Sequence, residues 1–314
     1  MRDSEENYTA IGVGVVGTRD AREDLIQCLP DGPRFKPVAF CDEGCEDQGP
    51  TEKPLDYHQD YNLLLKDPEL ELVLVKGPVT KRKDFAVRAL NAGKHVVLDR
   101  PFCEESDGAE RIMKTALRKK LVATCDLPGR NDPDYAALQN ALREANVGGA
   151  YAIEGFRLFP PEARKREELL DVYGFEMLDQ LQMLVSTEIK SVSTHVFRPH
   201  ESRPAQHFMI HVAMRGDGWA ALHGSVLARS GHPQWTAYTP DAIFTAEGGE
   251  AVLHEREGST PLEAGPPVED FWENLFLAIR EEAPLKCHPA DVVRAMKLHE
   301  ATLESARVSE PTVL

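Results

Sequence analysis

The sequence predicts an α/β fold joined to an α+β fold. The first part is a doubly wound parallel sheet of the Rossmann type, and the second is an antiparallel sheet covered by helices on one face. Short β-branched segments alternate with helical segments over residues 10–125, which is typical of parallel sheets. Over residues 191–257 apolar and polar residues alternate between turn signals, which is typical of antiparallel strands with one buried face.

The composition predicts a globular protein that partners neither nucleic acid nor membrane. The chain has 314 residues, of which 42% are hydrophobic, and its mean hydropathy is -0.38. A net charge of -16 argues against nucleic acid and against anionic membrane surfaces. The N-terminus is acidic and polar, unlike a signal peptide. Six cysteines without a CxxC pair indicate reduced thiols and a cytoplasmic location.

The first predicted strand, residues 10–16, contains a misleading glycine motif. Residues 12–17 match G-x-G-x-x-G, but that fingerprint must follow a strand and open a helix. No strand of sufficient length precedes Gly12, so we place the turn at Gly17. The following helix is then expected to begin near Asp20 with a capping-box pattern.

In this register the phosphate loop begins at Gly17 and Thr18. Arg19 and Arg22 then occupy the positions of the second and third glycines, where side chains would crowd a pyrophosphate. Two interpretations stay open. The arginines bind another anion at the helix N-terminus, or they are solvated over a site that no longer binds a dinucleotide.

The second predicted strand, residues 36–42, ends in an acid. The separation between Gly17 and Asp42 suits a carboxylate that holds the adenosine ribose of a dinucleotide. If a cofactor binds, Asp42 favours NAD over NADP.

A third segment also predicts a ligand-binding edge. A helix ends at Gly93, a short buried strand covers residues 96–98, and Asp99, Arg100 and Pro101 follow it. Charged residues at the carboxyl end of a buried strand are where ligands usually lie in α/β sheets.

Residues 89–101, ALNAGKHVVLDRP, resemble a segment of the glucose–fructose oxidoreductase / inositol dehydrogenase / MocA (Gfo/Idh/MocA) family. Residues 275–306 resemble the terminal segment of that family, so the resemblance covers nearly the whole chain. The turn that contains Pro78 also resembles the family. In the family a Glu-Lys-Pro lysine is catalytic, and Arg100 stands in its place here.

Residues 168–185 resemble the family helix that carries Asp-x-Gly-x-His-x-x-Asp. Alignment on Gly174 and Asp179 places Glu176 at the histidine, and an alternative alignment places Phe175 there. Neither register supplies the histidine. The helix is equally explained by packing of a stripe formed by Leu178, Leu181 and Leu184.

The resemblance implies the following organisation: a flexible tail (1–9), a Rossmann-type domain (10–128), an antiparallel-sheet domain for substrate and oligomerisation (129–290), and a terminal helix that returns to the first domain (291–314). It implies NAD or NADP, with NAD preferred, unless dinucleotide binding has been lost altogether. It also implies a homodimer or homotetramer through the open face of the second sheet. The implied cofactor-binding residues are Gly17, Thr18, Arg19, Asp42, Pro78, Asp99 and Pro101.

The implied activity is NAD(P)-dependent oxidation of a sugar- or cyclitol-like molecule. Arg100 stays protonated and can hold an oxygen or an anion but cannot exchange a proton. Glu176 or Tyr173 would then handle the proton. Whether the chain is an enzyme stays open, because a non-catalytic binding or regulatory protein, or a non-redox enzyme on an anionic substrate, fits the same residues.

No metal site is expected. His207 and His211 share a strand face, but four residues of strand span roughly 13 Å, which is too far for two ligands of one ion.

Overall fold

The computed structural model describes residues 8–18, 29–30, 32–43, 56–144, 149–159, 169–200, 204–227, 232–262 and 270–314. The chain divides into two compact units. The first comprises residues 1–126 and 269–293, and the second comprises residues 127–268 and 294–314. Among the residues described, no helix has both the length and the apolar character needed to cross a membrane.

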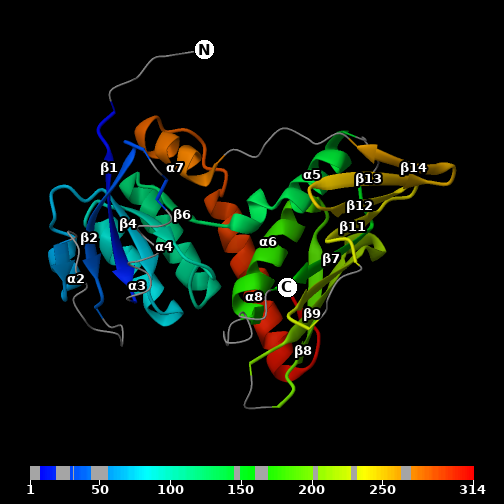
Figure 1. The fold of residues 1–314 in the computed structure, drawn as a ribbon. Helices are drawn as coiled ribbons and strands as arrows, with labels where there is room; N and C mark the ends of the chain where they lie inside the picture. The colour runs from blue at the N-terminus through cyan, green and yellow to red at the C-terminus, as the bar shows by residue number, and fades with distance from the viewer. Residues whose placement is uncertain are drawn as a thin grey trace, which may run out of the picture. The chain divides into compact units, whose positions relative to one another are not determined.

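The first unit is built on a six-stranded parallel sheet (Figure 1). The strands lie in the order β3-β2-β1-β4-β5-β6. Strands β2 and β3 are added on one side of β1, and strands β4 to β6 on the other. The topological switch point, where doubly wound folds bind ligands, therefore lies between β1 and β4. The strand bounds are Ile11–Gly17 (β1), Phe35–Cys41 (β2), Asp56–His58 (β3), Leu72–Lys76 (β4), His95–Leu98 (β5) and Ala123–Cys125 (β6).

Apolar side chains bury both faces of this sheet. On one face, Val13 and Leu74 cluster with Leu275 and Phe276 of helix α7. On the other face, strand residues such as Val73 are also fully buried, as expected for a parallel sheet covered on both sides. The helices of this unit are Tyr61–Leu64 (α2), Val79–Asn91 (α3), Ser106–Lys119 (α4) and Phe271–Arg280 (α7).

The second unit contains a nine-stranded sheet in the order β14-β13-β12-β11-β7-β10-β9-β8-β15. Its pairs are antiparallel except β7 with β10, which is parallel. The bounds are Ala152–Leu158 (β7), Ile189–Phe197 (β8), His207–Met214 (β9), Trp219–Ser225 (β10), Trp235–Tyr238 (β11), Ile243–Glu247 (β12), Glu250–Glu255 (β13), Gly258–Leu262 (β14) and Thr312–Val313 (β15).

Helices cover one face of this second sheet (Figure 1). Leu178 and Leu298 from the helices pack with Ile210, Leu222 and Trp235 from the strands in one buried cluster. The helical segments are Pro128–Asn131 (η1), Pro133–Glu144 (α5), a π-helical turn over Leu169–Gly174 (η3), Phe175–Leu184 (α6) and Pro289–Val308 (α8). The predicted fold class is therefore confirmed for both units.

Several predicted segments cannot be compared with the structure, and two observed strands were not predicted. The helix near Asp20 and most of the loop after β2 lie outside the described residues, as does most of the predicted tail. The strands β3 and β15 were not predicted. Helix α7 belongs to the first unit, and residues 294–314 belong to the second. The predicted domain boundary between residues 128 and 129 stays a prediction.

Candidate functional site

Two glycines meet at the switch point of the first sheet. Gly17 ends β1 and pairs with Lys76 of β4, and Gly77 follows directly. A Cβ built on Gly77 would lie 4.0 Å from the Cα of Gly17 and 3.2 Å from the Phe85 ring. Neither residue carries a side chain, and a side chain on Gly77 would meet Phe85, so this strand edge has the bare backbone that close approach of a pyrophosphate requires.

The earlier glycines of the motif serve packing instead. Gly12 and Gly14 lie inside β1. A Cβ on Gly12 would lie 1.8 Å from the carbonyl oxygen of Glu69, and one on Gly14 would lie 2.7 Å from Leu70. This confirms that Gly12 and Gly14 belong to the strand predicted over residues 10–16, so the phosphate loop does not begin at Gly12. Thr18 is half-buried after β1, while Arg19 and Arg22 lie outside the described residues.

Asp42 lies directly after β2 and is 3% exposed. The Tyr57 hydroxyl, on the neighbouring strand β3, donates a hydrogen bond to Asp42 Oδ2 at 2.9 Å. Glu43 is held differently: it accepts from Arg88 at 2.6 Å and from the backbone N–H of Tyr61 at 2.6 Å. The Arg88 guanidinium lowers the pKa of Glu43. Two adjacent carboxylates therefore lie at this edge, and Asp42 has the position of the predicted ribose ligand.

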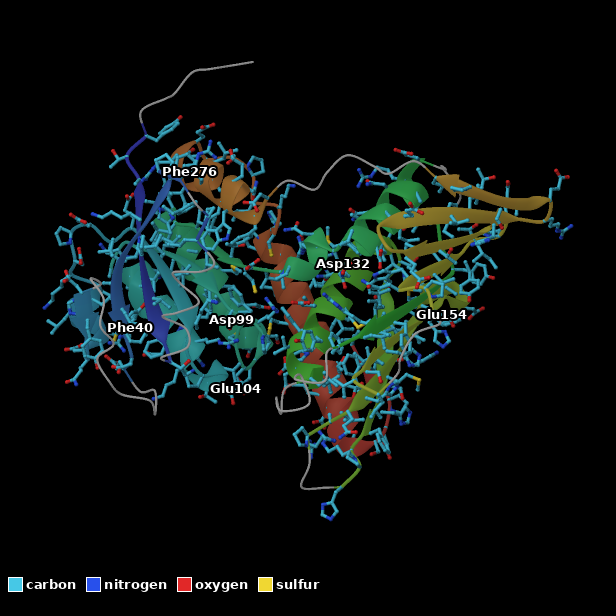
Figure 2. All side chains as sticks on the ribbon, in the orientation of Figure 1. Phe40, Asp99, Glu104, Asp132, Glu154 and Phe276 are labelled. Atoms are coloured by element: carbon cyan, nitrogen blue, oxygen red, sulfur yellow. The ribbon has the colours of Figure 1, made fainter. Side chains whose placement is uncertain are left out.

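The loop after β5 is tied to the loop after β4 by a buried arginine. Arg82 of α3 is 8% exposed. Its Nε donates to the carbonyl of Gly77 at 2.9 Å, and Nη1 donates to the carbonyl of Pro101. Its Nη2 lies 3.7 Å from the carboxylate of Asp99, which Figure 2 labels in this loop. Arg82 is not among the predicted site residues, and its signal in the sequence is the basic run of residues 81–83.

Arg100 lies in a charged cluster at the same sheet edge. Its backbone N–H donates to Asp99 Oδ1 at 2.9 Å, and its peptide bond to Pro101 is cis. Burial raises the pKa of Asp126, which follows β6, while Arg100 and Lys76 act in the opposite direction. The ends of β4, β5 and β6 thus share one electrostatic environment. Arg100 supplies it with a fixed cation that can hold an oxygen or an anion. Pro78, also predicted as a cofactor contact, is exposed ahead of α3.

The other two predicted catalytic residues lie in the second unit. Glu176 lies in the first turn of α6 and is 2% exposed. Arg157 of β7 donates to its Oε2 at 3.0 Å and also lies 3.8 Å from the carboxylate of Asp132, labelled in Figure 2. Tyr173, in the π-helical turn, stacks on Phe159 at a centroid distance of 3.9 Å. Glu176 is therefore part of a buried ion-pair network that the sequence did not reveal.

Asp179, the last acid of the family-like motif, has a structural partner. It is 1% exposed and receives two hydrogen bonds of 2.7 Å from Arg130. Leu178 and Leu181 are fully buried, and Leu184 packs at the edge of the same core. The predicted packing stripe is thus confirmed. In the part of the chain that the structure describes, no group of three His, Cys, Asp or Glu side chains could hold a metal ion.

Residues 11–126 match the family model GFO_IDH_MocA, described as an oxidoreductase family with an NAD-binding Rossmann fold. The resemblance to the Gfo/Idh/MocA family is thereby confirmed. The chain is 24% identical over 286 residues to inositol 2-dehydrogenase 2 of Saccharopolyspora erythraea, covering 88% of this chain and 82% of that one. It is 22% identical over 293 residues to scyllo-inositol 2-dehydrogenase (NADP(+)) of Bacillus subtilis, covering 80% and 81%.

Solved structures share the fold of this chain. An NAD-binding protein from Listeria innocua superposes with a TM-score of 0.81 at 19% identity, covering 96% of both chains. An oxidoreductase from Bacillus cereus gives 0.78 at 15% identity, covering 97% of this chain and 99% of that one. The family implies a nicotinamide dinucleotide cofactor and a small-molecule substrate.

Proposed function

We propose that this protein is an NAD-dependent oxidoreductase that acts on a hydroxyl group of a cyclitol- or sugar-like molecule. The observation that carries the proposal is the pair Gly17 and Asp42 at the switch point of the first sheet. The bare backbone beside Gly77 suits a pyrophosphate, and the Asp42 carboxylate suits ribose hydroxyls. The names of the two inositol dehydrogenases support the substrate class.

The charges at the ribose position favour NAD over NADP. A 2′-phosphate would lie beside the carboxylates of Asp42 and Glu43, and like charges at short range disfavour binding. Arg88 neutralises Glu43 through its ion pair at 2.6 Å, so the main discrimination comes from Asp42. The NADP(+) in the name of the Bacillus subtilis relative belongs to that protein, and we do not extend it to this chain.

A bound nicotinamide would supply a hydride-accepting carbon. The protein must then hold the substrate oxygen and remove its hydroxyl proton. We assign the first task to Arg100, whose permanent charge stabilises a developing alkoxide. We assign the second to Glu176, with Tyr173 as the alternative. The ion pair with Arg157 holds the Glu176 Oε2 in one orientation.

We further propose that the protein assembles as a homodimer or homotetramer through the open face of the second sheet. The helices cover the opposite face, and the open face carries large exposed side chains such as Phe197, which is 52% exposed. Exposed apolar groups of this size on a sheet face are typical of protein–protein contacts.

Titration with NADH tests the cofactor proposal. We expect saturable enhancement of nicotinamide fluorescence, and weaker binding of NADPH. Asp42→Ala should raise the Kd for NADH by about tenfold to a hundredfold, because a hydrogen bond to a charged group contributes roughly 1.5–3 kcal/mol. Asp56→Ala is the matched control, since Asp56 is an exposed acid at the start of β3 and should leave the Kd unchanged.

Because Arg100 replaces the family lysine, two functions other than redox catalysis also fit this chain. A non-catalytic binding protein would show a ligand-induced stability change without turnover of any inositol or sugar in the presence of NAD. A non-redox enzyme on an anionic substrate would form product without added nucleotide. Absence of binding up to millimolar NADH and NADPH would reject the redox proposal.

A further inference from the structure

Five adjacent strands of the second sheet, β7 to β11, carry little charge on the open face. Among the outward positions of β7, β9, β10, β11 and residues 191–197 of β8, Glu154 is the one formally charged side chain, although charged residues make up 28% of the chain. Figure 2 labels Glu154 on the side of the sheet turned away from α5 and α6. Its carboxylate already accepts a hydrogen bond from Tyr238 at 2.8 Å.

Histidines take the place of charged residues on this face. His195, Met209, His223 and Phe156 form one row across four strands, because each is paired with the next in register. His207 lies 5.7 Å from His223 between ring centroids. His232 packs on Phe156 at 5.0 Å, and His211 stacks on Trp219 at 6.4 Å. Five of the chain's 11 histidines therefore gather on one face.

We infer that this face is a contact between two copies of the chain that acid opens, because its histidines must be neutral when the copies are joined. The inference rests on the assembly proposed above and adds proton control to it. A chain with a net charge of -16 can approach a second copy closely only through a surface that lacks this charge. A standard interface uses about 20 residues from each partner, and the outward side chains of five strands supply nearly that number.

The physical reason for acid control is the scarcity of counter-charges among the described residues of this face. Burial already lowers the pKa of His207 in one copy, and burial together with His207 lowers that of His223. A covering copy would add further burial and bring a second set of histidines to the face. Among the described residues, the groups that face this pair are Glu154, His195, His211, His232 and Tyr238. Only one carboxylate per copy, that of Glu154, is therefore present there to stabilise a protonated histidine.

Proton binding and association of the two copies are linked, and the linkage has a definite sign. Joined copies bind fewer protons than separate ones, so each linked histidine weakens association by up to tenfold for each pH unit below its pKa. With two linked histidines per copy, four in the dimer, the dimer Kd should rise by about tenfold or more between roughly pH 7.5 and 5.5. Net charge predicts the opposite, because acid reduces the repulsion between two acidic chains.

Sedimentation velocity of the full chain over this pH range tests the inference. We expect a dimer-sized or larger species at neutral pH and monomer in acid, reversibly and with unchanged circular dichroism. His207→Gln with His223→Gln should retain the neutral-pH species and flatten the pH dependence. His288→Gln, an exposed histidine of the first unit, should leave the dependence unchanged.

A second pair of variants locates the contact. Ala221→Asp adds a carboxylate beside Glu154 and His211 and should give monomer at neutral pH. Leu117→Asp, at a side chain that is 82% exposed on α4, should not. Association that is unchanged or tighter in acid overturns the inference alone. Monomer at every pH overturns the proposed assembly as well, and NADH titration of the same samples shows whether the cofactor proposal stands independently.

Discussion

Removal of one partner of the ion pair between Arg130 and Asp179 should be among the most destabilising single substitutions in the second unit. Asp179 is 1% exposed and the Arg130 side chain 14%, and both hydrogen bonds are 2.7 Å long. In Arg130→Met the Asp179 carboxylate keeps the Gln182 amide, at 2.9 Å, but loses its cation. Breaking a buried pair by removal of one partner costs about 3–5 kcal/mol, since a buried charge is left uncompensated.

Urea unfolding in a Trp272→Phe background measures this cost. The fluorescence then reports the second unit through Trp219 and Trp235. With a slope of about 2 kcal/mol per molar urea, the midpoint should fall by about 1.5–2.5 M. Arg307 and Glu304 form a pair with the same two-bond geometry at 2.7 and 2.9 Å but with exposed side chains, so Arg307→Met should leave the midpoint unchanged. A loss below about 1 kcal/mol in Arg130→Met would refute the reasoning, since that is the range of exposed pairs.

Three further predictions follow from other buried groups. Gly12→Ala should lower stability by about 2–3 kcal/mol, because its Cβ would overlap the carbonyl of Glu69 in a packed strand; Gly149→Ala, with no atom within 4 Å of the new Cβ, is the control in a thermal melt. Burial lowers the pKa of His299 to about 4 despite the Asp171 carboxylate at 3.8 Å. The unfolded state therefore binds the extra proton, and stability that is present above pH 6.5 is lost progressively toward pH 4 by roughly 3 kcal/mol; His299→Gln should flatten that slope in urea titrations at several pH values. Arg82→Met should weaken NADH binding by about tenfold, because two loop carbonyls lose their buried donor, whereas Lys83→Met, an exposed neighbour, should leave fluorescence titrations unchanged.

Much of the first unit could be predicted because its signals are local. The apolar run of residues 96–98 predicts a strand. Gly93, which has a φ of 81°, predicts the end of a helix a few residues earlier. The burial of Gly12 and Gly14 confirms the strand predicted over residues 10–16, whereas the turn at Gly17 stays a prediction. By contrast, β3 and β15 comprise three and two residues, which is too short for a periodic pattern, and pairing with β2 and β8 defines them.

The site residues that the sequence missed act through contacts between distant segments. Tyr57 reaches Asp42 only because β3 pairs with β2, and Arg82 matters because the loops after β4 and β5 lie side by side. The partner of Glu176 is Arg157 of β7. That strand contains both apolar and charged residues, so its sequence does not predict that Arg157 is paired. A charged residue in such a strand is equally well explained by solvent exposure, so only the tertiary fold identifies these pairs.

The core of the first unit is completed by residues from the far end of the chain. Val13 and Leu74 are covered by Leu275 and Phe276, which lie beyond all but the last strand of the second unit. During synthesis the first six strands therefore leave the ribosome with one apolar face uncovered until α7 emerges. Since domains ordinarily fold as they emerge, we expect the core of the first sheet to be completed only after α7 is synthesised, and a product that ends before residue 271 to expose this apolar face.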